Sequence, residues 1–151
     1  MVMKKKIFLF AFLSFVLFLS FQLYEPHYKK QKISKQTDSL LVKKHLDFLA
    51  NHPTFRNYKN VERLDSVAHY IKNHFAQSSD SVRFQNYEVD GKMYKNVICS
   101  FGTENKKRII VGAHYDVCGD QNGADDNATG TTALLELSRL LKGESLITGL
   151  I

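Results

Sequence analysis

Cysteine is scarce in this sequence, and the two that occur, Cys99 and Cys118, have no paired spacing. Two isolated cysteines cannot form a zinc knuckle, and a disulfide framework requires more of them. If residues 95–101 and 108–114 pair as a hairpin, Cys99 lies roughly opposite residue 110 and Cys118 lies well beyond bonding distance. We therefore expect no disulfide bond between the two cysteines.

Several sequence motifs of catalytic and binding sites are also missing. The chain contains no H-E-x-x-H, no G-x-S-x-G and no G-x-x-x-x-G-K. A calcium-binding EF-hand loop beginning at Asp120 fails, because Asp125 stands at its sixth position, where glycine is needed. Its twelfth position is Thr131, where glutamate is needed. These absences leave neither a helical zinc-protease motif, nor a serine-hydrolase elbow, nor a phosphate loop, nor an EF-hand.

The longest apolar run lies at the N-terminus, at residues 7–23, directly after the lysines at 4–6. A basic segment followed by an apolar one is typical of an export signal. No small-x-small cleavage site follows the run, which is at the short limit of the roughly 17–25 residues of a membrane span. We therefore favour an uncleaved signal-anchor over a cleaved signal peptide. The expected location is exported, either membrane-anchored or periplasmic or extracellular.

The formal net charge of +6 does not indicate a nucleic-acid-binding protein. Half of it comes from the lysines at 4–6, and most of the rest from the lysine-rich segment that follows the apolar run. A membrane surface or a solvated linker explains such charge better, so we expect no nucleic-acid partner. The predicted organisation is a signal peptide or signal-anchor at 1–24, a polar linker at 25–39 and one domain at 40–151.

Hydrophobic periodicity predicts an α/β domain with a mixed sheet. The run RIIVGA at 108–113 is continuously apolar, which is typical of a strand covered on both faces. Asp90-Gly91 is a strong signal for a two-residue hairpin turn. The predicted elements are helices at 40–49 and 60–75, strands at 82–89, 94–101 and 108–113, and a last helix that ends at Lys142-Gly143.

An acidic loop follows the predicted strand 108–113. His114 and Asp116 stand two residues apart, so their side chains leave the chain on the same face. A carboxylate there can hold the imidazole in one tautomer and leave its other nitrogen free for a metal. In Asp125-Asp126, one carboxylate can reach back toward His114 while the other caps the following helix. Aspartate and histidine without a thiolate suit zinc. The alternative is a solvated acidic turn in which Asp126 or Asn127 is only a helix cap.

The segments VGAHYD at 111–116 and GADDNATG at 123–130 resemble the paired metal motifs of the co-catalytic zinc aminopeptidases, metallopeptidase family 28 of clan MH. A weaker similarity extends upstream to 57–60 and 94–97 and covers roughly residues 40–142. The resemblance implies an α/β/α sandwich with a mixed sheet, two zinc ions, and removal of N-terminal residues from peptide substrates. Related glutaminyl cyclases have a similar fold with one zinc, but their second motif does not read Asp-Asp-Asn.

The same resemblance implies a role for several residues of the loop. His114 is expected to bind one zinc, Asp125 to bridge both ions, and Asp116 to orient His114. The peptide bond between Asp125 and Asp126 is expected to be cis. Gly130 is expected to let the last helix pack close to the sheet.

The family mechanism further requires a Glu-Glu pair, whose first member is the general base, and then an aspartate and a late histidine. In this chain Glu144 is the only acid after the last predicted helix, and the tail 143–151 carries no predicted strand. We therefore expect a truncated zinc peptidase domain with no catalytic residue of its own and no appreciable peptidase activity. The alternative is a membrane-anchored, non-catalytic fragment or interaction module.

Overall fold

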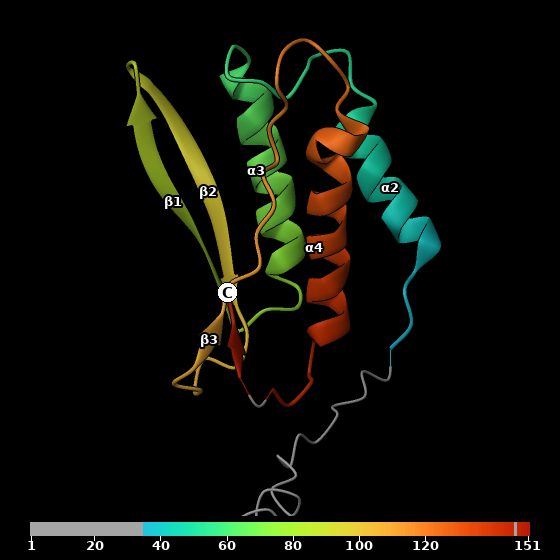
Figure 1. The fold of residues 1–151 in the computed structure, drawn as a ribbon, viewed down its shortest axis with the longest axis vertical. Coiled ribbons are helices and arrows are strands. Elements are labelled where there is room, and N and C mark those ends of the chain that lie inside the picture. The colour runs from blue at the N-terminus through green and yellow to red at the C-terminus, as the bar shows by residue number, and fades with distance from the viewer. Residues whose placement is uncertain (1–34, 147) are drawn as a thin grey trace, which may run out of the picture. The chain divides into compact units, whose positions relative to one another are not determined.

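The structure is a computed structural model that describes residues 35–146 and 148–151 (Figure 1). The predicted signal or anchor at 1–24, its membrane span at 7–23 and most of the linker at 25–39 lie outside these residues. No helix in the described part of the chain is both long and apolar enough to cross a membrane.

Three α-helices form the body of the domain: α2 (Ser39–Ala50), α3 (Val61–Phe75) and α4 (Thr129–Leu141). Their bounds agree closely with the periodicity of the apolar residues. Helix α2 begins where Asp38 Oδ1 accepts hydrogen bonds from the backbone N–H groups of Leu40 and Leu41, at 3.0 and 3.1 Å. The helices bury a shared core, in which each large side chain contributes roughly 1.5–3 kcal/mol. Its fully buried members include Leu49, Val67, Ile71, Phe75, Ala128 and Leu135.

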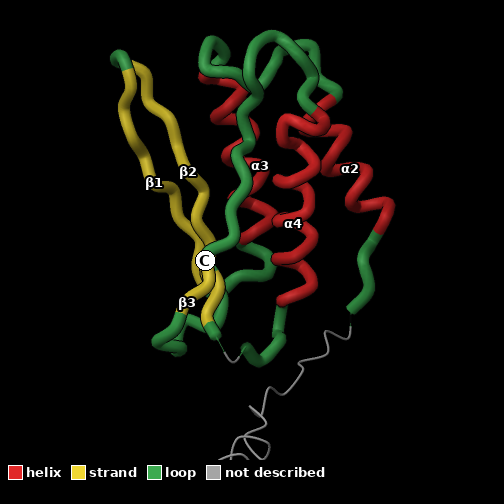
Figure 2. The backbone as a smooth tube through the Cα atoms, in the orientation of Figure 1, coloured by secondary structure: helices red, strands yellow, loops and turns green. Residues whose placement is uncertain are grey.

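Strands β1 (Ser81–Val89) and β2 (Lys92–Ser100) form the predicted antiparallel hairpin. Asp90 and Gly91 both have positive φ angles, 51° and 72°, as a two-residue turn of this kind requires. The hairpin packs along α3, and α4 lies on the other side of that helix with α2 beyond it (Figures 1 and 2). The prediction of a mixed α/β domain is therefore confirmed.

The prediction of a strand at 108–113 covered on both faces is wrong. Strand β3 spans only Arg108–Ile109, and the side chains of Ile109, Ile110 and Val111 are 53%, 78% and 44% exposed. A continuous apolar run becomes buried only where other elements cover both of its faces. None of the described elements covers the outer face of this run.

The tail does contain a short strand, contrary to the prediction. Strand β4 (Gly149–Leu150) pairs in parallel with β3. On its other side, Phe101 and Leu150 exchange two backbone hydrogen bonds of 2.9 Å. The tail thus lies between the end of β2 and β3, where the sequence suggested direct pairing of 95–101 with 108–114. Cys99 lies opposite Val82 instead, and both cysteines are free thiols.

Candidate metal site

The loop that follows β3 runs past α3 and α4 and carries the predicted site (Figure 1). His114 Nδ1 lies 3.2 Å from Asp116 Oδ1, so the two side chains do meet on one face. Tyr115, between them, points the other way, and its hydroxyl donates to the carbonyl of Lys95 on β2. Thr131 Oγ1 on α4 donates to the carbonyl of His114 at 3.1 Å. This segment is therefore held at both β2 and α4, while its histidine faces solvent.

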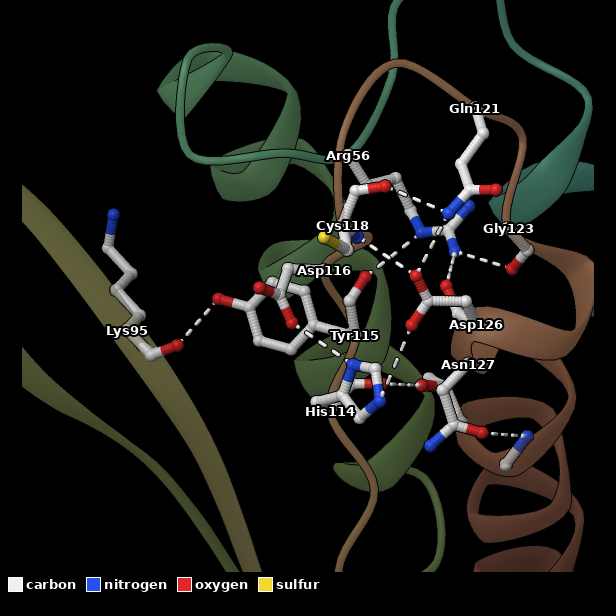
Figure 3. A network of polar contacts seen from close by, with 12 residues as sticks. Arg56, Lys95, His114, Tyr115, Asp116, Cys118, Gln121, Gly123, Asp126 and Asn127 are labelled. Atoms are coloured by element: carbon white, nitrogen blue, oxygen red, sulfur yellow. Dashed lines mark hydrogen bonds and ion pairs between the residues drawn. The ribbon is translucent and has the colours of Figure 1, made fainter.

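The carboxylate that faces His114 belongs to Asp126 and not to Asp125. Asp126 Oδ1 lies 3.7 Å from His114 Nε2. Its other oxygen, Oδ2, accepts hydrogen bonds from the Cys118 backbone N–H at 2.9 Å and from Gln121 Nε2 at 3.2 Å (Figure 3). The Asp125 side chain is exposed and forms no ion pair or hydrogen bond with the rest of the described chain.

The backbone explains why the second aspartate turns inward. Asp126 and Asn127 have non-helical angles, with φ of −116° and −131° and ψ of 78° and 46°, so the chain departs from the helical path there before α4 begins. The cis peptide bond expected between Asp125 and Asp126 lies one residue later, between Asp126 and Asn127. The prediction for this bond is therefore corrected by one position. Of the two carboxylates, either of which could reach His114, the structure brings that of Asp126 to it.

Asn127 caps the start of α4, because its Oδ1 accepts a hydrogen bond from the backbone N–H of Gly130 at 3.1 Å. This cap also accounts for the glycine: a Cβ atom at position 130 would lie 2.3 Å from Asn127 Oδ1. The prediction that Gly130 permits close packing of helix against sheet thus identified the right position for a different reason. The close neighbour is the capping side chain.

Arg56 lies beneath the loop and is only 2% exposed. Its guanidinium donates hydrogen bonds to the carbonyls of Tyr115 and Gly123, each at 2.9 Å (Figure 3). It also donates to the carbonyl of Asn122 at 2.8 Å. Burial lowers the pKa of Arg56, an effect that the charges of Asp126 and Asp116 oppose. The sequence analysis missed this residue because segment 51–60 has no hydrophobic periodicity that would indicate a buried side chain.

His114 and Asp126 have the separation that two ligands of one zinc require. Ligands bound at about 2.0–2.1 Å in a tetrahedral site lie roughly 3.3 Å apart, close to the 3.7 Å between His114 Nε2 and Asp126 Oδ1. Within residues 35–146 and 148–151, however, no three His, Cys, Asp or Glu side chains come together to surround a metal ion. The described residues therefore fit part of a zinc site, to which they bring one nitrogen and one oxygen ligand.

A cleft of about 570 Å³ opens beside His114 and Asp116. Its walls come from α3, from the hairpin and from the start of α4, and they are mainly apolar and aromatic. Such a composition is common in sites that bind small organic molecules or side chains. The aromatic residues that line it are Tyr58, Phe75, Tyr87, Tyr94 and Tyr115.

Comparison with known protein families and curated sequences supports the motif assignment. Residues 96–148 match the model of peptidase family M28. An uncharacterized protein of Escherichia coli (strain K12), YfbL, is 39% identical over 106 residues, which cover 65% of this chain and 32% of that protein. The chain therefore spans about a third of the length of this curated relative.

Solved structures resemble the domain as well. A leucine aminopeptidase precursor from Bacteroides thetaiotaomicron matches with a TM-score of 0.60 and 27% identity, over 80% of this chain and 47% of that protein. A glutaminyl cyclase from the same organism matches with a TM-score of 0.57 and 28% identity, over 77% and 45%. A Tannerella forsythia glutaminyl cyclase, at 20% identity and a TM-score of 0.61, over 77% and 45%, shares the fold. Residues 96–148 therefore match the sequence pattern of peptidase family M28, and the fold is similar to that of an aminopeptidase and of glutaminyl cyclases, of which this chain spans less than half the length.

Proposed function

We propose that this chain supplies the first metal ligands of a zinc-dependent aminopeptidase. The convergence of His114 Nε2 and Asp126 Oδ1, 3.7 Å apart at the end of the β3 segment, carries this proposal. The proposal is supported by the match of residues 96–148 to a peptidase family and by the similarity of the fold to that of an aminopeptidase. The Asp-Asp-Asn sequence at 125–127 favours the aminopeptidase over the glutaminyl cyclase, in line with the resemblance of the loop motifs.

In this proposal Asp126 takes the role that the sequence motif suggested for Asp125. In this arrangement His114 Nδ1–H donates to Asp116, which holds the ring so that Nε2 faces Asp126. Asp126 keeps Oδ1 available because its Oδ2 is engaged by Cys118 and Gln121. Zinc bound at such a site would polarise a peptide carbonyl and acidify a bound water. The cleft beside His114 would receive a side chain of the peptide substrate.

Zinc titration of the chain, followed by the ring ¹⁵N resonances of His114, tests this assignment with a matched pair of variants. We expect wild-type chain to bind zinc weakly, because two protein ligands are fewer than the three of a catalytic zinc. Asp126→Asn should weaken the His114 response by about tenfold or more, whereas the neighbouring Asp125→Asn should leave it unchanged. If Asp125→Asn weakens the His114 response and Asp126→Asn does not, the metal-binding role belongs to Asp125, as the sequence resemblance implied. If zinc does not change the His114 resonances of wild type, the loop is a solvated acidic turn.

Hydrolysis of aminoacyl-4-nitroanilides measures the catalytic side of the proposal. The described residues bring two metal ligands together and place no glutamate beside them, so a general base is missing from this site. We therefore expect the 151-residue chain on its own to show no turnover above the reaction without protein. Turnover that is lost in Asp126→Asn would contradict this expectation while supporting the metal assignment.

A further inference from the structure

We propose that Arg56 is a positioning residue for the His114–Asp126 site, which it holds together by binding the backbone carbonyls of the loop from below. The inference has two parts. The effect of Arg56 on zinc binding rests on the proposed function. The effect of Arg56 on the order of the loop rests only on the contacts that Arg56 makes.

The guanidinium reaches both sides of the site. Nε donates to the carbonyl of Tyr115, which directly follows His114 in the chain, at 2.9 Å. Nη2 donates to Gly123 at 2.9 Å and approaches the carbonyl of Asp126 itself at 3.4 Å. A third group, Nη1, donates to the carbonyl of Asn122 at 2.8 Å. The Arg56 side chain thus connects Tyr115, the neighbour of the proposed ligand His114, to the backbone of the proposed ligand Asp126.

Arg56 also ties the loop to the helical core. Its Nη1 donates a further hydrogen bond to the carbonyl of Leu49, in the last turn of α2. Its own carbonyl accepts from the Val117 backbone N–H at 2.8 Å. The loop therefore sits on α2 through a buried charge, and movement of the loop would leave that charge without its acceptors. Removing the partners of a buried charge is costly, which keeps the loop in place.

Only an arginine can make these contacts together. A guanidinium presents five N–H donors in a rigid plane, whereas a lysine ammonium offers three donors at one point. At Gly123, whose carbonyl binds Arg56, the loop packs closely on itself, because a Cβ atom would lie 2.4 Å from the carbonyl oxygen of Asp126 and from Val117 Cγ2. Gly123 also has a φ of 60°, which favours glycine.

The charge of Arg56 acts on the site as well as its shape. No carboxylate forms an ion pair with the guanidinium in the described part of the chain, yet Asp126 and Asp116 both contribute favourably to its charged form.

Arg63 is a matched control for this role. It is also buried, at 5% exposure, and its Nη2 donates to the carbonyl of Phe48 at 2.6 Å, next to the acceptor Leu49 of Arg56. Its guanidinium lies over the Phe48 ring, 4.9 Å from the centroid. None of the hydrogen bonds of Arg63 within the described residues reaches the loop at 114–126.

The experiment compares Arg56→Met, Arg56→Lys and Arg63→Met in the 151-residue chain by amide hydrogen exchange without metal. The reporter is the Cys118 N–H, which donates to Asp126 Oδ2. We expect Arg56→Met to speed its exchange about tenfold relative to the amides of α3, the factor that one lost hydrogen bond gives. Arg56→Lys should increase this relative exchange rate to an intermediate degree. Arg63→Met should leave the exchange rate of the Cys118 N–H, relative to the amides of α3, unchanged.

Zinc titration of the same variants, read from the His114 ring resonances, gives the second measurement. Arg56→Met should weaken the response by roughly tenfold, as outer residues of metal sites do, and Arg63→Met should not. If Arg56→Met does not fold, Arg56→Lys decides. If the Cys118 N–H of Arg56→Lys exchanges as slowly as in wild type, and His114 of this variant responds to zinc as in wild type, the proposal is wrong. A wild-type chain that binds no zinc would refute the proposed function, while the exchange data would still test Arg56.

Discussion

Adjacent residues of the loop differ sharply in role although their chemistry is the same. Asp125 is exposed and unpaired among the described residues, whereas the carboxylate of Asp126 lies between Cys118, Gln121 and His114. The non-helical backbone at 126 and 127 produces this difference, because it rotates the second side chain off the helix surface. Asn127 then takes the capping role that frees Asp126 for the site.

Substituting Gly130 with alanine should destabilise the domain through this cap. The new Cβ would lie 2.3 Å from Asn127 Oδ1 and would displace the side chain from the N–H it binds. Loss of a helix cap costs about 1 kcal/mol. Urea unfolding should show this decrease in Gly130→Ala and little change in Gly112→Ala, where a Cβ would meet nothing within 4 Å. Equal stability of the two variants would show that the cap is not essential.

Helices α2 and α3 are joined by a polar cluster around the buried His45, in addition to their apolar core. His45 on α2 is 1% exposed, and its Nδ1 lies 2.7 Å from Tyr70 Oη on α3. The His74 ring, also on α3, meets it edge-on at 4.6 Å between centroids. The pKa of His45 is lowered to about 4, mainly by burial and also by His74 and Lys44, while Glu136 on α4 acts in the opposite direction. Burial lowers the pKa of His74 as well.

Helix packing should therefore weaken on acidification. His45 is neutral in the folded chain but takes up a proton near pH 6.5 when unfolded, so stability that is complete above pH 6.5 is lost as the pH falls toward about 4. The effect is on the order of 2–3 kcal/mol. Unfolding free energies measured from pH 7 to pH 4 should depend less on pH in His45→Gln. The exposed His69 provides the comparison, because His69→Gln should keep the wild-type slope. An unchanged slope in His45→Gln would show that the buried imidazole does not control this dependence.

The molecule as described has one apolar side without cover. Ile109, Ile110 and Val111 are all substantially exposed, and a groove of about 360 Å³ runs beside them between β2 and α4. Exposed apolar strand segments with free backbone groups promote association between chains. Both features arise because, within residues 35–146 and 148–151, β3 pairs on one side only, with the short strand β4.

The isolated chain should self-associate through the exposed apolar segment at 109–111. Ile110→Lys should lower the fraction of large species in light scattering and size-exclusion chromatography several-fold, because it places a charge on the 78% exposed isoleucine. Leu40→Lys is the control, since Leu40 is equally exposed, at 80%, but stands alone on α2. Equal association of the two variants would argue against the strand as the contact surface.

The sequence sufficed to predict what depends on local pattern. Periodicity of 3.6 residues marked the helices, Asp-Gly marked the hairpin turn, and the spacing of His114 and Asp116 placed them on one face, because each follows from backbone geometry over a few residues. The paired motifs also indicated the M28 resemblance.

Tertiary contacts were needed for the rest. Which aspartate of the pair faces His114 depends on a non-helical backbone at 126 and 127 that neither residue encodes alone. Arg56 became recognisable only where the chain brings the end of α2 beneath the loop, more than fifty residues away in sequence. Whether the apolar run at 108–113 is buried likewise depends on the elements around it. Hydrophobicity expresses only a tendency to be buried, and the surrounding elements determine whether burial occurs.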